Sequence, residues 1–372
     1  MADANLSDWA AIGARVALAR SALKLTQAEF ARRVGLDRTA LSRIESGSRH
    51  LSVLELSALA RAADLPIDWF IMEPEPVVAS RRADALNDLS IVDLRVEALV
   101  REVAQLLELG LLRPTVSRLE LSVPRNVNEA AAAAAKVRVS LDAGSAPLTD
   151  LSAAAESLGL LVYSLPLSEG DADGAYAAIG NGVGVALLNG SRPSGRRRFT
   201  LAHEIGHHVF QDAYAVDVEA TGRSEAERVI DAFAAHLLLP RPALERRWLE
   251  LNGDEDPRSA AIVIGAEYRL SWTALCSHLV NVGLLDRRQG EVVREARPRA
   301  GDYAERGIAI VEELAAPMAA RLVAQAVLRG YRTHRLGVGR TLELLYGTLT
   351  EADLPDREEV PLAALAGDLR SA

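Results

Sequence analysis

The chain has few cysteines, few aromatic residues and no long apolar run. Its 372 residues include one cysteine, Cys276, which excludes an internal disulfide and suits a reducing, cytoplasmic compartment. Aromatic residues make up 4% of the chain, whereas Ala and Leu dominate its apolar residues, which favours helices. No stretch approaches the roughly 18 apolar residues that a membrane helix needs. The polar, acidic first residues show no signal peptide.

Acidic residues outnumber basic ones, 51 to 42, so the net charge is −9. This balance argues against indiscriminate binding of nucleic acid by the whole chain. Residues 1–72 are nearly neutral, however, and five of their arginines lie close together in the sequence: Arg32, Arg33, Arg38, Arg43 and Arg49. The chain length predicts two or three domains, of which the first carries this basic cluster.

The most informative pattern is His203-Glu204-Ile205-Gly206-His207, an H-E-x-x-H motif set in apolar residues that suit a helix. Positions i and i+4 share a helix face, so both imidazoles can reach one zinc ion at roughly 2.1 Å. Glu204 lies next to them, where it can take a proton from water at the metal. The motif predicts metal-assisted hydrolysis of a peptide bond, with one zinc per chain or another divalent metal in its place.

A second amphipathic helix is predicted over residues 224–240, with Ser224 as its N-cap and Pro240 as its stop. Glu227 and Asp231 are one turn apart on one face of it. Glu227 can complete a set of two histidines and one glutamate, and Asp231 can accept the free N–H of His203. The alternative is that Ser224 and Glu227 form only a capping box, which would leave the metal one ligand short.

Other residues near the motif are weaker candidates. Glu219 and Glu225 lack an acidic partner four residues on, and His208 and His236 fit surface or packing positions better than metal ligation. Besides the metal, Tyr176 and His236 are the candidates for stabilising an oxyanion. The run Arg196–Arg198 fits a solvated loop, or a site that guides an acidic substrate segment.

These residues carry a family resemblance. The run from Arg197 to His208, followed by Glu227-x-x-x-Asp231-x-Phe233-Ala234-Ala235 and Leu237-Leu238-Leu239-Pro240, resembles the ImmA/IrrE metallopeptidases. The resemblance covers about residues 128–285 and implies a small sheet that includes residues 174–176 and 185–189. Active members cleave helix-turn-helix repressors and so switch on DNA-damage or mobile-element genes. The family usually has Asn where this chain has Asp231, and Asp can accept the same hydrogen bond.

The first 72 residues show short stretches of helical periodicity. Ile12, Val16 and Ala19 indicate one helix, residues 25–34 a second with Thr26 as its cap, and residues 38–45 a third capped by Asp37. Gly35 turns the chain between the second and third, and residues 51–63 supply further apolar faces. Two short helices joined by a Gly-containing turn make a helix-turn-helix unit.

This segment resembles the XRE, lambda-repressor-like, DNA-binding family at Leu25-Thr26-Gln27, at Gly35 and at Leu41-Ser42-Arg43-Ile44-Glu45-x-Gly47. The resemblance implies that Gln27 contacts a phosphate and that Arg38, Thr39 and Arg43 read bases, with Ser42 a lesser candidate. The partner is then an operator in double-stranded DNA, bound by a homodimer. The alternatives are that the arginines only solvate an all-α domain, or that the domain binds protein.

Elsewhere the sequence is less informative. The run Met72-Glu-Pro-Glu-Pro76 cannot continue a helix and ends the first domain. Leucines and valines in residues 84–112 predict one or two helices, for dimerisation or for packing between domains. Residues 304–329 are helical by composition, and residues 331–354 suggest another helix pair of unknown role.

The sequence thus predicts a mainly α fold with a small β-sheet (α+β). It divides into a five-helix lambda-repressor-like domain (1–72), a helical connector (73–127), a zincin-like metallopeptidase domain (128–290) and a helical C-terminal region (291–372). The predicted function is a cytoplasmic DNA-binding regulator with a gluzincin-like zinc endopeptidase that cleaves a repressor or antitoxin. The two halves are expected to act as independent modules. One alternative is a ligand-responsive XRE factor that uses the peptidase-like domain as a sensor and cuts nothing. Another is an antitoxin-like binding protein.

Overall fold

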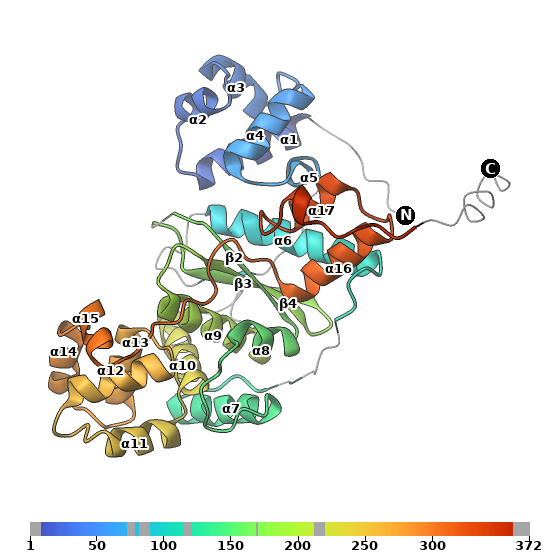
Figure 1. Cartoon of the computed structure of the whole chain (residues 1–372). Helices are drawn as coiled ribbons and strands as arrows, with labels where there is room; N and C mark the ends of the chain where they lie inside the picture. The colour runs from blue at the N-terminus through green and yellow to red at the C-terminus, as the bar shows by residue number, and fades with distance from the viewer. Residues whose placement is uncertain are drawn as a thin grey trace.

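The computed structural model describes residues 9–72, 79–81, 90–114, 119, 121–168, 170–211 and 220–359. Helices dominate these residues, and one four-stranded sheet lies among them. Figure 1 shows the N-terminal helices on one side of the sheet and the longest run of helices on the other. The prediction of a mainly α fold with a small sheet is confirmed. The run Glu73–Pro76, predicted to end the first domain, lies outside the described residues.

Five helices form the N-terminal unit, as predicted: α1 (Trp9–Ala22), α2 (Gln27–Arg33), α3 (Arg38–Glu45), α4 (Val53–Ala63) and α5 (Ile67–Ile71). Thr26 caps α2 and completes a capping box with Glu29, and Asp37 caps α3 by accepting from the backbone N–H of Ala40. Gly35 has φ +72°, a conformation that glycine adopts without steric cost, and this turns the chain between α2 and α3.

The sheet has the order β1-β3-β4-β2. Its strands are β1 (Ala79–Arg81), β2 (Leu160–Leu165), β3 (Gly174–Gly180) and β4 (Val183–Asn189). β2 and β4 are parallel, whereas β3 is antiparallel to both β4 and β1. Alternate residues of the central strands enter two different cores: Tyr176 and Ala186 belong to one, Ala175 and Val185 to the other.

The helix α6 (Ile91–Glu108) lies between the sheet and the N-terminal helices. Its buried apolar residues join a core that also contains Trp69 of α5 and Ala175 of β3. Glu97 of α6 accepts from Arg15 at 3.0 Å and from the indole N–H of Trp69 at 2.9 Å. Most of the predicted apolar segment 84–112 is thus used to pack the two halves together, and these side chains are not available for a dimer contact.

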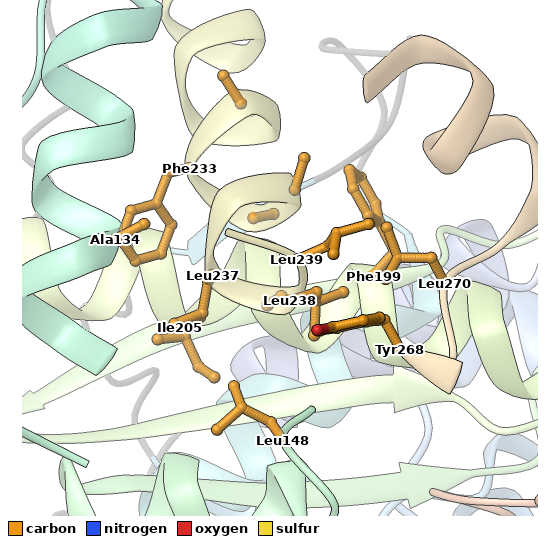
Figure 2. Packing of buried hydrophobic residues seen from close by; sticks show 14 of the residues in the cluster. Ala134, Leu148, Phe199, Ile205, Phe233, Leu237, Leu238, Leu239, Tyr268 and Leu270 are labelled. Atoms are coloured by element: carbon orange, nitrogen blue, oxygen red, sulfur yellow. The ribbon is translucent and has the colours of Figure 1, made fainter. Parts of the chain in front are cut away.

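The other face of the sheet is covered by α8 (Leu151–Ser157) and α9 (Ser194–Phe210). α10 (Ala220–Leu238) packs against α9, and α7 (Val127–Ser140) packs against α10. Figure 2 shows Phe233 and Leu237 of α10 beside Ala134 of α7 and Ile205 of α9. Four further helices follow: α11 (Arg241–Glu250), α12 (Pro257–Glu267), α13 (Trp272–Asn281) and α14 (Arg287–Glu295).

The C-terminal part returns to the sheet. After α15 (Ala300–Glu305), residues 308–320 are not helical, so the prediction of helix over residues 304–329 is wrong for most of that range. Instead, Met318 pairs with Ser164 of β2, and the Ser164 hydroxyl donates to the carbonyl of Leu314. Backbone groups that pair with a strand cannot also form helical bonds. The described part of this region continues with α16 (Arg321–Arg332), α17 (Val338–Leu344) and a 3-10 turn (Glu351–Asp353).

None of the described helices has the length and apolar character that crossing a membrane requires.

Candidate metal centre and nucleic-acid interface

The H-E-x-x-H motif lies in the second half of α9, as the spacing predicts. His203, Glu204 and His207 are each 1% exposed or less, because the sheet covers one side of the helix and α10 the other. The helix begins at Ser194, so Arg197 and Arg198 belong to it and are buried. The solvated loop predicted for Arg196–Arg198 is therefore wrong.

α10 begins at Ala220, four residues before the predicted N-cap Ser224. Ser224 is inside the helix, so the alternative in which Ser224 and Glu227 only cap a helix end is wrong. Gly206 of the motif lets α10 come close to α9: a Cβ there would lie 3.0 Å from Phe233 Cδ1 and 3.1 Å from Ile230 Cγ2. A larger residue would push α10, and Glu227 with it, away from the histidines.

Three donor atoms converge between α9 and α10. The Nε2 atoms of His203 and His207 are 3.0 Å apart. Glu227 Oε2 lies 3.1 Å from His203 Nε2, and Glu227 Oε1 lies 4.0 Å from His207 Nε2. The ligand atoms of all three residues lie within 4.8 Å of one another.

This arrangement fits a tetrahedral metal ion. Ligands bonded to zinc at roughly 2.0–2.1 Å in tetrahedral geometry are about 3.3 Å from each other, and the observed separations of 3.0, 3.1 and 4.0 Å bracket that value. Two imidazole nitrogens and one carboxylate are donors that zinc commonly takes. Three protein ligands leave the fourth position open, as catalytic zinc sites do.

Asp231 holds the other side of His203. Its Oδ1 lies 2.9 Å from His203 Nδ1, so Nδ1 donates to the carboxylate and Nε2 is left with its lone pair toward the cluster. Burial raises the pKa of Glu227, but its contacts with His203 and His207 outweigh burial and hold the pKa below its ordinary value. Glu227 is therefore a carboxylate at neutral pH, the form that binds a metal.

Glu204 lies beside the first residue of β3. A Cβ added to Gly174 would lie 3.3 Å from Glu204 Oε1 and 2.5 Å from Thr200 Cγ2. Glycine at this position therefore lets the backbone of β3 approach the face of α9 that carries the motif. The backbone of β3 at Gly174 therefore lies close to the carboxylate of Glu204, which is the group predicted to move the proton.

The remaining histidines of this region are packing residues, as predicted for His208 and His236. His208 Nε2 bonds to the carbonyl of Leu158 at 2.9 Å, and Nδ1 lies 3.3 Å from the Tyr176 hydroxyl. His236 lies against His278 with ring centroids 4.6 Å apart. Burial lowers the pKa of His236 to about 4. Burial is also the main cause that lowers the pKa of His278 to about 3, so both rings are neutral at neutral pH.

The donor cluster found among the described residues includes none of the four side chains just described, namely Tyr176, His208, His236 and His278. Glu225 is exposed and is not in the cluster either. Glu219 lies outside the described residues. Tyr176 and His236 were the candidates for oxyanion stabilisation. Tyr176 contacts His208 and His236 contacts His278, and these contacts give no structural support for that role.

The predicted DNA-contacting residues of α3 share one exposed face: Arg38, Thr39, Ser42 and Arg43. Leu41 and Ile44 on its other face are buried in the N-terminal core. Gln27, at the start of α2, donates to Glu45 Oε2 at 2.7 Å, and Arg20 donates to Glu45 Oε1 at 2.6 Å. Glu45 thus braces the end of α3 against α1 and α2.

Comparison with known proteins finds a family match for each of the two regions. Residues 16–70 match the family model described as helix-turn-helix. Residues 155–279 match the model of the IrrE N-terminal-like domain, a peptidase family. The chain thus carries one region similar to each of these two families. The second match includes the donor cluster and Glu204, and the first includes all of α2 and α3. No curated protein matches the chain.

Sequence reasoning missed the support of the IrrE-like domain by the C-terminal part. Arg198, which is fully buried, donates to Glu313 and to the carbonyl of Leu148. Arg197 donates to Glu312 and to the carbonyl of Glu313. No local pattern connects arginines of α9 with acids more than a hundred residues later. The contacts of Arg197 and Arg198 with residues 312–313 cross the domain boundary predicted at residue 290. That boundary stays a prediction.

Proposed function

We propose that this chain is a cytoplasmic, zinc-dependent endopeptidase and DNA-binding regulator that cleaves a protein, a repressor or an antitoxin, in a stress or mobile-element response. The observation that carries the proposal is the convergence of His203, His207 and Glu227 on one point beside Glu204. The match to a peptidase family supports it. The DNA-binding half rests on the exposed polar face of α3 and on the helix-turn-helix match.

Each residue has a defined part in the proposed hydrolysis. His203, His207 and Glu227 would hold the zinc, and Asp231 would keep His203 in the tautomer that presents Nε2. Bound zinc supplies Lewis acidity, which brings the pKa of water toward neutrality. Glu204 accepts the proton that the attacking water loses as its oxygen bonds to the scissile carbonyl carbon. Glu204 then gives a proton to the leaving amine as the C–N bond breaks.

On the DNA side, Arg38, Thr39 and Arg43 would contact base edges, Ser42 would add a lesser contact, and Gln27 would contact a phosphate. A homodimer would place two α3 helices about one helical turn of DNA apart. The dimer contact predicted at residues 84–112 has no support from the buried side chains of α6. The dimer therefore needs another surface.

The test is to express the chain with each helix-turn-helix repressor encoded beside its gene and to search by mass spectrometry for a cut. Wild type should produce one cut that disappears in Glu204→Gln. Metal analysis of the same samples should give about one zinc per chain in both proteins, since Glu204 is not a ligand. If zinc is present but no partner is cut, the proposed cleavage is wrong and the non-cleaving sensor gains support.

A further inference from the structure

A second feature of the IrrE-like domain is a cavity of about 890 Å³ at the first turn of α9. Segments distant in sequence enclose it: residues 192–196, the start of α13 and the non-helical stretch near residue 311. Its walls combine arginines with apolar and aromatic side chains, among them Arg192, Arg196, Arg269, Leu270, Trp272 and Tyr303. The volume falls in the range of about 300–1,000 Å³ that is typical of ligand pockets.

The cavity carries more positive than negative charge, in a chain whose net charge is −9. Arg192 and Arg196 share a single carboxylate, Asp173, at 2.7 Å and 2.6 Å. Arg269 binds Glu313 at 3.1 Å, and the buried Arg198 binds the same carboxylate. Among the residues that line the cavity, the arginines Arg192, Arg196, Arg269 and Arg297 outnumber the acids Asp173 and Glu312, which leaves an excess of positive charge.

The cavity and the candidate metal centre lie along one face of α9. Arg196, Thr200 and Glu204 are four residues apart in turn, so their side chains follow one another on that face. Eight residues of helix separate Arg196 from Glu204 by about 12 Å, which an extended peptide spans with three or four residues. Asp173 in the cavity wall also directly precedes Gly174, the residue beside Glu204.

We infer that this cavity binds an acidic segment of the protein substrate, three or four residues from the scissile bond. The inference rests on the proposed peptidase function and specifies the substrate class. Arginine binds carboxylates through paired N–H groups, and the apolar wall can take the residues between the acids. A peptide fits better than a small free anion, because the cavity is large and Arg196 in its wall lies on the same helix face as Glu204.

The test measures binding without cleavage. Two fluorescein-labelled peptides of about ten residues, long enough to span cavity and metal centre, are titrated against the full chain carrying Glu204→Gln, and their anisotropy is followed. One alternates Ala and Glu, and the other alternates Ala and Gln. The Glu peptide should bind at least about tenfold more tightly, since charge-assisted hydrogen bonds are roughly twice as strong as neutral ones.

Three variants in the same background locate the site. Arg196→Gln should weaken binding of the Glu peptide and leave the Gln peptide unchanged. Asp173→Asn should tighten binding of the Glu peptide, because Arg192 and Arg196 lose the carboxylate they share. A gain of affinity cannot come from misfolding. Arg246→Gln is the matched control, because this arginine lies on α11, outside the cavity wall, with its side chain 55% exposed.

The inference is overturned if the two peptides bind equally, if Asp173→Asn fails to tighten binding, or if Arg246→Gln weakens it as much as Arg196→Gln does. It is also overturned if inorganic phosphate displaces the Glu peptide where chloride at equal ionic strength does not, since that result indicates a small-anion site. Because no step needs hydrolysis, failure of the proposed cleavage and failure of acid-selective binding give different results.

Discussion

The helices α3 and α9 both carry candidate functional residues, but they present them in opposite ways. The predicted base-reading side chains of α3 are all exposed, whereas Leu41 and Ile44 on its other face are buried in the core. In α9 the metal-binding and proton-transferring candidates are all buried. A large ligand such as DNA can be met at the surface, whereas metal chemistry needs several donors held in a protected interior. Substitutions in α9 should therefore have larger effects on the protein than substitutions in α3.

The largest expected effect comes from His207→Ala. It removes one of three donors that lie within 4.8 Å of one another, so zinc loading and cleavage should both be lost. DNA binding should remain, because α3 lies in another part of the molecule. Metal analysis and an operator-binding assay on one preparation check this. Equal zinc content in wild type and His207→Ala would show that the metal is held elsewhere.

The second prediction tests whether the two regions are independent modules, as the sequence suggested. Glu97→Ala leaves Arg15 without its carboxylate and Trp69 without its acceptor, between the N-terminal helices and α6. Breaking a buried ion pair in this way should lower the free energy of unfolding by about 3–5 kcal/mol. Both DNA binding and zinc retention should then become more sensitive to temperature.

Glu108→Ala is the matched control for Glu97→Ala, because Glu108 is an exposed residue at the end of the same helix. Thermal unfolding and operator binding are measured for both variants, and the two sets of results are compared. If Glu97→Ala melts like Glu108→Ala, the contact between the halves contributes little and the modules are independent after all.

Asp231→Ala should weaken the metal site without abolishing it. The carboxylate lies 2.9 Å from His203 Nδ1 and fixes the ring, so its loss should cost about 10–100-fold in metal affinity. Asp231→Asn keeps an acceptor and should restore most of that affinity. Competition with a zinc chelator measures both. Unchanged affinity in Asp231→Ala would mean that packing alone orients His203.

Arg43→Ala should have the most confined effect. It removes one exposed side chain from α3 and should cost about 1–3 kcal/mol in specific DNA binding. Zinc content should not change. Operator and scrambled DNA compared at one salt concentration separate base reading from phosphate attraction. Equal losses on both sequences would mean that Arg43 contacts the backbone and reads no base.

Local patterns accounted for the secondary structure around both regions. Thr26, Asp37 and Gly35 act within a few residues of themselves, so the limits of α2 and α3 follow from sequence. The spacing of His203 and His207 fixes their shared face for the same reason. Local patterns failed where the outcome depended on distant partners. Residues 308–320 have a helical composition, but they are not helical, and they instead pair with β2 at Met318 and contact α9 through Glu313.

Sequence alone thus predicted the H-E-x-x-H helix, the exposed face of α3 and the kind of chemistry proposed for each, since these depend on periodicity and on neighbours one turn away. Tertiary structure brought Glu227 and Asp231 to the histidines, because only the packing of α10 on α9 at Gly206 sets that distance. In the tertiary structure, α6 also packs between the two halves, and Glu313 forms an ion pair with Arg198. Residues far apart in the chain meet only when buried area offsets the entropy lost in closing the loop between them.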